Sequence, residues 1–178
     1  PGRTVVIDPI IALIEDQVES LRGYGIDRVT AISSDRLQDG DRRAILDEVA
    51  SGDPLFVLIA PERLQTPDFR SALTQMSAVT SVNLAVVDEA HCVSEWGHQF
   101  RTSYLGLGGV IRQTCADATK TRPPILALTG TASRAVLRDV LFQLEIEERT
   151  EHTLVRPSTF DRPELSFDVR VVQPLEAE

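Results

Sequence analysis

A chain of 178 residues has the size of one domain and can bury a hydrophobic core. Its 42% hydrophobic and 25% charged residues are typical of a globular protein, and no apolar run approaches the ~20 residues of a membrane span, which excludes a membrane-spanning protein. The net charge of −9 excludes DNA binding through bulk positive charge, so any contact with nucleic acid has to be local.

The predicted elements alternate between short apolar strands and amphipathic helices. The strands are β-branched runs of four to six residues, at 4–7, 29–32, 55–60, 84–87, 125–128 and 153–156. The helices have apolar residues at helical spacing, at 9–23, 41–50, 67–76, 110–118 and 129–144. This alternation predicts an α/β three-layer sandwich with a mostly parallel sheet and right-handed crossovers.

Two of these helices have a polar residue and a proline at their start. Asp8-Pro9 and Thr66-Pro67 each match an N-cap followed by proline at the first helical position. The glycines in LGLGG, residues 105–109, follow no strand and precede no GKS or GKT, so they predict a turn into a helix and no phosphate loop.

The strand at 84–87 ends in two adjacent carboxylates, Asp88 and Glu89. In an open α/β sheet, ligands bind outside the carboxyl ends of the strands. Two adjacent like charges at this position repel each other, which is unfavourable unless a cation offsets the repulsion or a function requires both carboxylates. In phosphoryl transfer, the first acid can hold magnesium through water while the second orients and deprotonates the attacking water. The alternative is that the four residues Asp-Glu-Ala-His occur here by chance and form a solvated turn without a function.

Residues 90–101, AHCVSEWGHQFR, extend this match. Together with Asp88-Glu89 they closely resemble the Walker B motif and aromatic-rich loop of RecQ-type DNA helicases, which are superfamily 2 motors with a DEAH box. Residues 5–21, 58–64 and 127–133 resemble motifs Ia, Ib and III of the same family. Three residues depart from the family's usual pattern: Asp8 in place of Ser, Thr102 in place of Pro and Gly130 in place of Ala.

The resemblance implies roles in ATP hydrolysis for the polar residues at these strand ends. Asp88 would hold Mg2+ through water, and Glu89 would activate the attacking water. Thr129 and Thr131 would bind the Walker B carboxylates and His91, so that His91 and Thr131 relay the nucleotide state. The alternative for Thr129 and Thr131 is a helix N-cap without any further role.

The resemblance also implies contacts with DNA along several loops. The residues assigned to nucleic acid are Pro9, Ile10, Arg63, Trp96, His98, Phe100 and Arg101. Arg63 has two alternatives, a phosphate contact or pairing with Glu62 or a helix end. Trp96 is the only tryptophan in the sequence, and the alternative to a contact with DNA is that it anchors the hydrophobic core.

Walker A is missing from these 178 residues. A P-loop needs a lysine, and the single lysine, Lys120, lies in ATKTRPP without a glycine loop or a preceding strand. We therefore expect part of a RecA-like lobe of the P-loop NTPase type that lacks the P-loop strand, with motifs Ia to III in residues 1–156. Residues 157–178 are predicted as a linker and the start of a second lobe.

The predicted function is that of a parent enzyme, an ATP-dependent DNA helicase that uses ATP and Mg2+, with this fragment alone inactive. Its expected partners are single-stranded and duplex DNA and a second RecA-like lobe in the same parent chain. The alternatives are a non-catalytic DNA-binding or scaffold module derived from a helicase lobe, and a DEAH-type RNA helicase, which lacks the Trp-Gly-His loop.

The cysteine content predicts an intracellular protein. Cys92 and Cys115 are too few for a disulfide framework and are expected to be free thiols in a reducing compartment, the cytoplasm and nucleoid of a bacterium or the nucleus of a eukaryote. The N-terminus has no signal-peptide pattern. A zinc site from Cys92, His91 and His98 is an alternative, but its spacing matches no usual ligand pattern.

Overall fold

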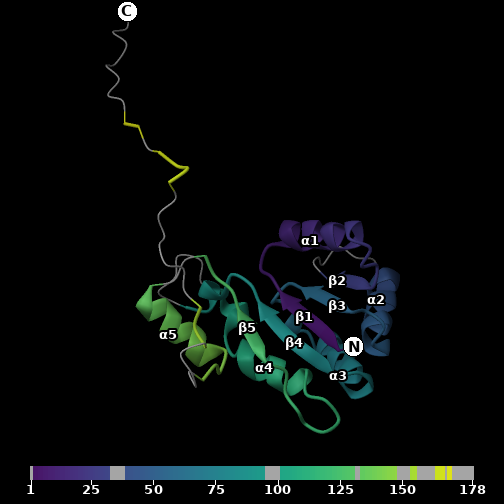
Figure 1. The fold of residues 1–178 in the computed structure, drawn as a ribbon. Coiled ribbons are helices and arrows are strands. Elements are labelled where there is room, and N and C mark those ends of the chain that lie inside the picture. Colours follow the sequence, from purple (N-terminus) through teal and green to yellow (C-terminus); the bar gives the residue numbers. More distant parts are fainter. Residues whose placement is uncertain are drawn as a thin grey trace, which may run out of the picture. The chain divides into compact units, whose positions relative to one another are not determined.

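The computed structural model describes residues 2–32, 39–94, 101–130, 133–147, 153–155, 163–166 and 168–169. The chain divides into two units, Pro1–Ile146 and Glu147–Glu178. The described helices and strands all belong to the first unit (Figure 1). In the second unit, residues 153–155 form no strand, so the strand predicted at 153–156 is not found there. No helix within the described ranges is long and apolar enough to cross a membrane.

Five parallel strands form the sheet, in the order β2-β3-β1-β4-β5. Each strand pairs with its neighbours in parallel, with Val5 opposite Val57 on one side and Ala85 on the other. The strands are β1 (Arg3–Ile7), β2 (Val29–Ile32), β3 (Phe56–Ile59), β4 (Val82–Val87) and β5 (Ile125–Ala127). The predicted parallel α/β sheet is confirmed.

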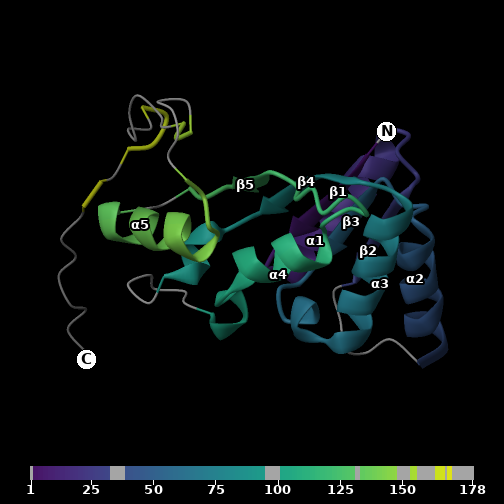
Figure 2. The same ribbon diagram turned by 90° about the horizontal axis from the view of Figure 1, so that it is seen from below.

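Helices cover both faces of this sheet (Figures 1 and 2). On one face, Ile14 and Val18 of the first helix pack against Val29, Leu58 and Ala60. The other face carries the larger core cluster, to which the remaining helices contribute. The helices are α1 (Ile11–Gly23), α2 (Asp39–Ser51), α3 (Pro67–Val79), α4 (Leu107–Thr114) and α5 (Arg134–Gln143), with short 3-10 helices η1 (Arg63–Gln65), η2 (Ala90–Val93) and η3 (Thr102–Tyr104). The three-layer sandwich is confirmed.

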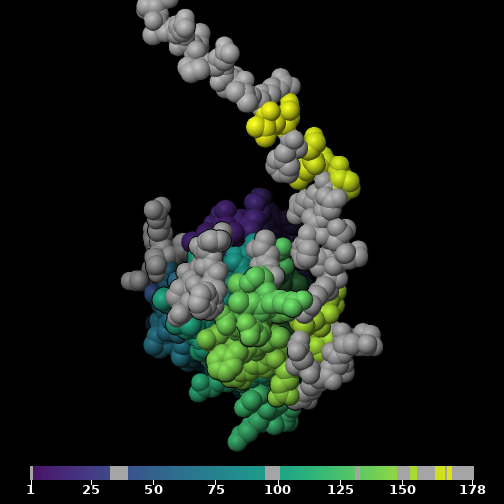
Figure 3. Space-filling model, turned by 90° about the vertical axis from the view of Figure 1, so that its left-hand side faces the viewer, coloured from purple at the N-terminus to yellow at the C-terminus, as the bar shows by residue number. Residues whose placement is uncertain are grey.

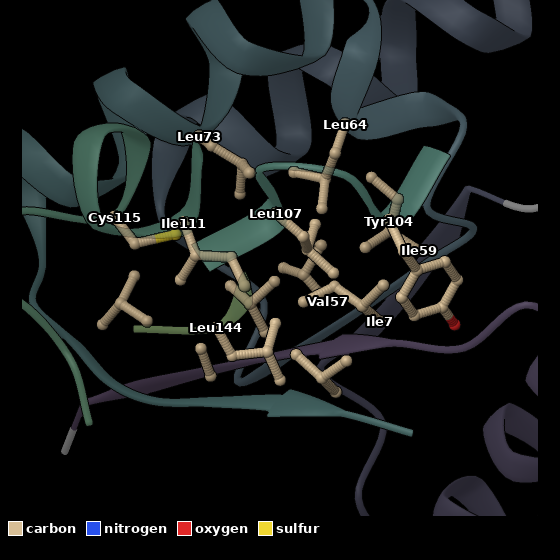
Figure 4. Packing of buried hydrophobic residues seen from close by; sticks show 14 of the residues in the cluster. Ile7, Val57, Ile59, Leu64, Leu73, Tyr104, Leu107, Ile111, Cys115 and Leu144 are labelled. Atoms are coloured by element: carbon tan, nitrogen blue, oxygen red, sulfur yellow. The ribbon is translucent and has the colours of Figure 1, made fainter. Parts of the chain in front are cut away.

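Alternating side chains of the strands build the two cores. In β1, Val5 and Ile7 enter the larger cluster, whereas Val6 lies against the smaller one beneath α1. Figure 4 shows Ile7 of β1 in the larger cluster together with Leu107 and Ile111 of α4. Burial of these side chains fixes the register of the sheet, and the register determines where each strand ends relative to its neighbours.

β5 is one of the two edge strands of the described sheet, and its side chains are only partly covered. Leu126 and Leu128 are exposed, as is Phe142 of α5. Figure 3 views the molecule from the side on which α5 lies and shows residues of β5 and α5 at the surface.

Of the three helix starts predicted from capping residues, one is right and two are wrong. α3 begins at Pro67 with Thr66 as its N-cap residue, as expected. α1 begins at Ile11, so Asp8 is not its N-cap and Pro9 is not its first residue. α5 begins at Arg134, where the Ser133 hydroxyl accepts from the Val136 amide, so Thr129 precedes the helix.

Candidate functional site

Polar residues gather at the carboxyl edge of the sheet, where parallel strands end side by side. Asp8 follows β1, Asp88 follows β4 and Thr129 follows β5. Backbone hydrogen bonds join each turn to the neighbouring strand: the Asp8 amide donates to Ile59 O at 3.1 Å, and the Asp88 amide donates to Ile7 O at 2.8 Å. These turns are therefore held in place by the sheet.

The turn after β4 bends the chain sharply at Glu89. Glu89 has φ 45 and ψ 42, in the left-handed region that a residue with a Cβ rarely occupies. Its amide donates to its neighbour Asp88 Oδ1 at 2.8 Å, and the Ala90 amide donates to Leu128 O at 2.9 Å. The bend sends the chain from β4 directly into η2 and leaves both carboxylates partly exposed.

His91 lies between the two strand ends. Its Nδ1 is 3.1 Å from Glu89 Oε2 and 3.0 Å from Thr129 Oγ1, and its side chain is largely buried. The structure thus brings together Glu89, His91 and Thr129, which the sequence analysis placed in one site. Both contacts are made by the same ring nitrogen, so Glu89 and Thr129 meet at His91 Nδ1.

The end of η2 is tied to α5 by a partly buried hydrogen bond. The Ser94 hydroxyl donates to Asp139 Oδ2 at 2.5 Å, and Ser94 is fully buried. The sequence analysis missed Asp139. Its position three residues after the buried Val136 and one before the buried Val140 places it beside the core-facing stripe of α5, which is the signal that indicates a buried partner.

Arg101 connects three turns of the site. Its Nη1 donates to Pro9 O at 3.0 Å and lies 3.6 Å from Glu62 Oε1, while its amide donates to Cys92 O at 3.0 Å. Its side chain remains 42% exposed, so the guanidinium can also meet solvent or a ligand. The structure places this predicted DNA-contacting residue between the turns after β1, β3 and β4.

Asp8 is completely buried behind this edge. Its carboxylate accepts from the Ile10 amide at 2.8 Å and from Gln17 Nε2 at 3.3 Å. Burial raises the pKa of Asp8, and the negative charges of Asp88 and Glu89 raise it further, against the Ile10 amide and Arg101, which lower it. The edge therefore concentrates negative charge.

The predicted DNA contacts of the turns after β1 and β3 differ in accessibility. Pro9 is buried and its carbonyl accepts from Arg101. The Ile10 side chain is exposed, but its amide donates to Asp8, so the backbone donor expected for a phosphate is occupied. Arg63 is 9% exposed in η1. Their contacts with DNA stay predictions.

Four predicted site residues, Trp96, His98, Phe100 and Thr131, lie outside the described residues. Within the described part of the chain, no group of three or more His, Cys, Asp or Glu residues is arranged to hold a metal ion directly. Cys92 and Cys115 are both free and buried, and burial raises the pKa of each thiol, to about 11 for Cys115.

Comparisons with known proteins agree with this geometry. The chain is 35% identical over 182 residues to the probable ATP-dependent DNA helicase RecS of Bacillus subtilis, covering 98% of this chain and 34% of the relative. It is 34% identical over 166 residues to the ATP-dependent DNA helicase RecQ of Haemophilus influenzae, covering 93% of this chain and 24% of the relative. The resemblance to RecQ-type helicases is confirmed.

A solved structure gives the same fold at lower identity. The helicase domain of Pyrococcus furiosus Hef matches with a TM-score of 0.56 and 16% identity, over 85% of this chain and 30% of that chain. The chain thus spans about a third or less of the length of the relatives it matches. The family model of DEAD/DEAH box helicases matches residues 1–140, and the chain belongs to this family.

Proposed function

We propose that this chain is part of an ATP-dependent DNA helicase of RecQ type, which couples hydrolysis of Mg-ATP to DNA unwinding. The observation that carries the proposal is the contact of Glu89 with His91, and of His91 with Thr129, beside Asp88 at the carboxyl edge of the sheet. The relatives named as ATP-dependent DNA helicases support it. A protein with this role would act inside the cell, with the nucleoid or in the nucleus.

Asp88 fits a magnesium site of the water-mediated kind. One of its oxygens accepts from the Glu89 amide, and the carboxylate is partly exposed at the edge of the sheet. Hard oxygen ligands suit Mg2+, so Asp88 would hold the ion, which would neutralise negative charge on the phosphates. A single protein carboxylate acting through water is consistent with the lack of a direct ligand cluster in the described ranges.

Glu89 would be the general base for the attacking water. Its carboxylate is partly exposed, and His91 holds one of its oxygens at 3.1 Å. A carboxylate fixed in this way can orient a water molecule and accept its proton. Thr129, whose hydroxyl contacts the same ring nitrogen of His91 as Glu89 does, connects this pair to the loop after β5, and with Thr131 it would report the nucleotide state to the rest of the lobe.

DNA would be sensed by the residues between η2 and η3. Trp96 and Phe100 would stack on bases, and His98 and Arg101 would contact phosphate or base edges. Because the net charge is −9, binding cannot depend on bulk attraction, so these few contacts would carry single-strand affinity in this lobe. A second RecA-like lobe of the same protein would begin within residues 157–178. It would complete the binding site for single-stranded and duplex DNA.

The experiment is the substitution Glu89→Gln in the full-length protein, with Glu19→Gln on the exposed face of α1 as the matched control. ATP binding should be retained, while turnover with single-stranded DNA should fall about 10²–10⁴-fold, the usual effect of losing a positioned base. Turnover within a few-fold of wild type would remove Glu89 from this role. A wild-type protein that binds DNA but never hydrolyses ATP would favour the non-catalytic module.

A further inference from the structure

Tyr104 places a polar group inside the hydrophobic core. The residue ends η3 and is completely buried, and its ring belongs to the same cluster as Ile7 and Ile59. In Figure 4 the ring lies at the edge of this cluster and its hydroxyl points away from the other labelled side chains. A buried hydroxyl needs a hydrogen-bond partner, because an unpaired one is strongly unfavourable.

The partner of this hydroxyl is the backbone of the acidic turn. Tyr104 Oη donates to the main-chain oxygen of Asp88, at 3.2 Å. Burial raises the pKa of Tyr104 far above its ordinary value, so the hydroxyl keeps its proton and acts as a donor.

The peptide group between Asp88 and Glu89 is consequently bound at both of its polar atoms. Its carbonyl accepts from Tyr104, and its N–H donates to Asp88 Oδ1 at 2.8 Å. Glu89 directly follows this peptide in the left-handed conformation, which is unfavourable for a residue with a Cβ and persists only where the surroundings hold it. The direction of the Glu89 carboxylate thus depends on the plane of this peptide.

Tyr104 is itself held in place by contacts outside the acidic turn. Its amide donates to Arg101 O at 3.0 Å, and the neighbouring Ser103 hydroxyl donates to Glu62 Oε1 at 3.0 Å. Gln65 Nε2 also donates to Ser103 O at 3.2 Å. η3 is therefore anchored to η1, and the hydroxyl approaches Asp88 from a fixed position.

We propose that Tyr104 is a positioning residue whose hydroxyl sets the plane of the Asp88–Glu89 peptide and so aims the Glu89 carboxylate at His91 and the attacking water. The inference rests on the proposed function, in which Glu89 is the general base. It adds a residue from the far end of the loop that follows the Walker B motif.

The first test is Tyr104→Phe in the full-length protein, which removes one oxygen atom and keeps the ring. Tyr24→Phe is the matched control, since Tyr24 is the only other tyrosine and is 85% exposed. For Tyr104→Phe, kcat with ATP and single-stranded DNA should fall about 5- to 50-fold, with KM for ATP within about 2-fold, because a misdirected base affects the transition state more than binding. The control should match wild type.

The second test measures hydrogen exchange over residues 84–94 in the same three proteins without nucleotide. The Glu89 and Ala90 amides should exchange faster in Tyr104→Phe and unchanged in Tyr24→Phe. Unchanged exchange at these amides, or unchanged kcat, would overturn the proposal. Faster exchange throughout the lobe with a melting temperature lower by many degrees would overturn it in favour of a structural role. If the wild type hydrolyses no ATP, the proposed function fails, and exchange still decides whether the hydroxyl holds the peptide.

Discussion

The adjacent glycines Gly108 and Gly109 of α4 should respond in opposite directions to the same substitution. A Cβ on Gly108 would lie 2.6 Å from the carbonyl carbon of Leu144 and 2.7 Å from Gln143 O, both backbone atoms at the end of α5. Neither atom can rotate away, so Gly108→Ala must separate α4 from α5. Overpacking of this kind costs about 1–3 kcal/mol.

Gly109 has room for a methyl group. A Cβ there would lie 3.5 Å from Glu145 Oε1, an ordinary contact with a side chain. Alanine is favoured over glycine inside a helix by about 0.5–1 kcal/mol. Gly109→Ala should therefore stabilise the protein by about this amount. Because Gly108→Ala has the same gain in helix propensity, the two variants should differ in their free energy of unfolding by the overpacking cost alone, about 1–3 kcal/mol.

Denaturant unfolding followed by circular dichroism, in parallel for wild type and both variants, measures this difference through the transition midpoints. A Gly108→Ala protein as stable as the Gly109→Ala protein would refute the close approach of α4 to α5. The comparison also concerns the site, because Asp139 of α5 accepts from Ser94 at the end of η2. In the full-length protein, displacement of α5 should lower ATP turnover in Gly108→Ala but not in Gly109→Ala.

Two further predictions concern the buried carboxylate and the single tryptophan. The pKa of Asp8 is higher in the folded state than its ordinary value of 3.8. Between the unfolded and the folded pKa of Asp8, the folded state therefore binds more protons than the unfolded state. The free energy of unfolding falls as the pH rises through this range. Asp8→Asn should raise the melting temperature at pH 7, with a gain that shrinks towards pH 4; a gain that grows on acidification would contradict this sign. In the full-length protein, Trp96→Ala should leave folding and DNA-independent ATPase intact and remove most of the DNA stimulation, since one stacked base contributes ~1–3 kcal/mol. ATPase assays with and without single-stranded DNA, together with thermal melting, check it, and a large drop in melting temperature with DNA stimulation retained would instead make Trp96 a core residue.

Local patterns in the sequence sufficed to predict the strands of the described sheet and the acidic turn, although the strand predicted at 153–156 is not found. The run at 84–87 is apolar and β-branched and stops at two carboxylates, and the structure ends β4 at Val87, as predicted. Strands buried on both faces need continuous apolar residues, so their positions are readable without knowledge of their neighbours. The start of α3 was equally readable because Thr66-Pro67 acts within a single turn.

The same cap pattern failed at Asp8, for a reason that lies elsewhere in the chain. The Asp8 carboxylate accepts a hydrogen bond from the Ile10 amide in a tight turn. Arg101, which is 92 residues away from Pro9 in the sequence, donates a hydrogen bond to the Pro9 carbonyl. With both groups engaged, the helix begins only at Ile11. LGLGG is a turn into a helix, as predicted, with Gly106 as the N-cap, but α4 runs from Leu107 to Thr114 and not from 110 to 118, so Gly108 lies inside the helix against the end of α5.

The sequence by itself determined the family and the parallel α/β architecture, and it supplied the residues proposed to act on ATP, because each depends on short patterns of apolar runs, caps and motifs. Only the tertiary structure decided which side chains orient them. Ser94 reaches Asp139 across 45 residues and Tyr104 reaches the backbone of Asp88 across 16. Such contacts depend on strand order and on the packing of η2 and η3 between α5 and η1, and no local pattern encodes the distance between segments that the sheet brings together.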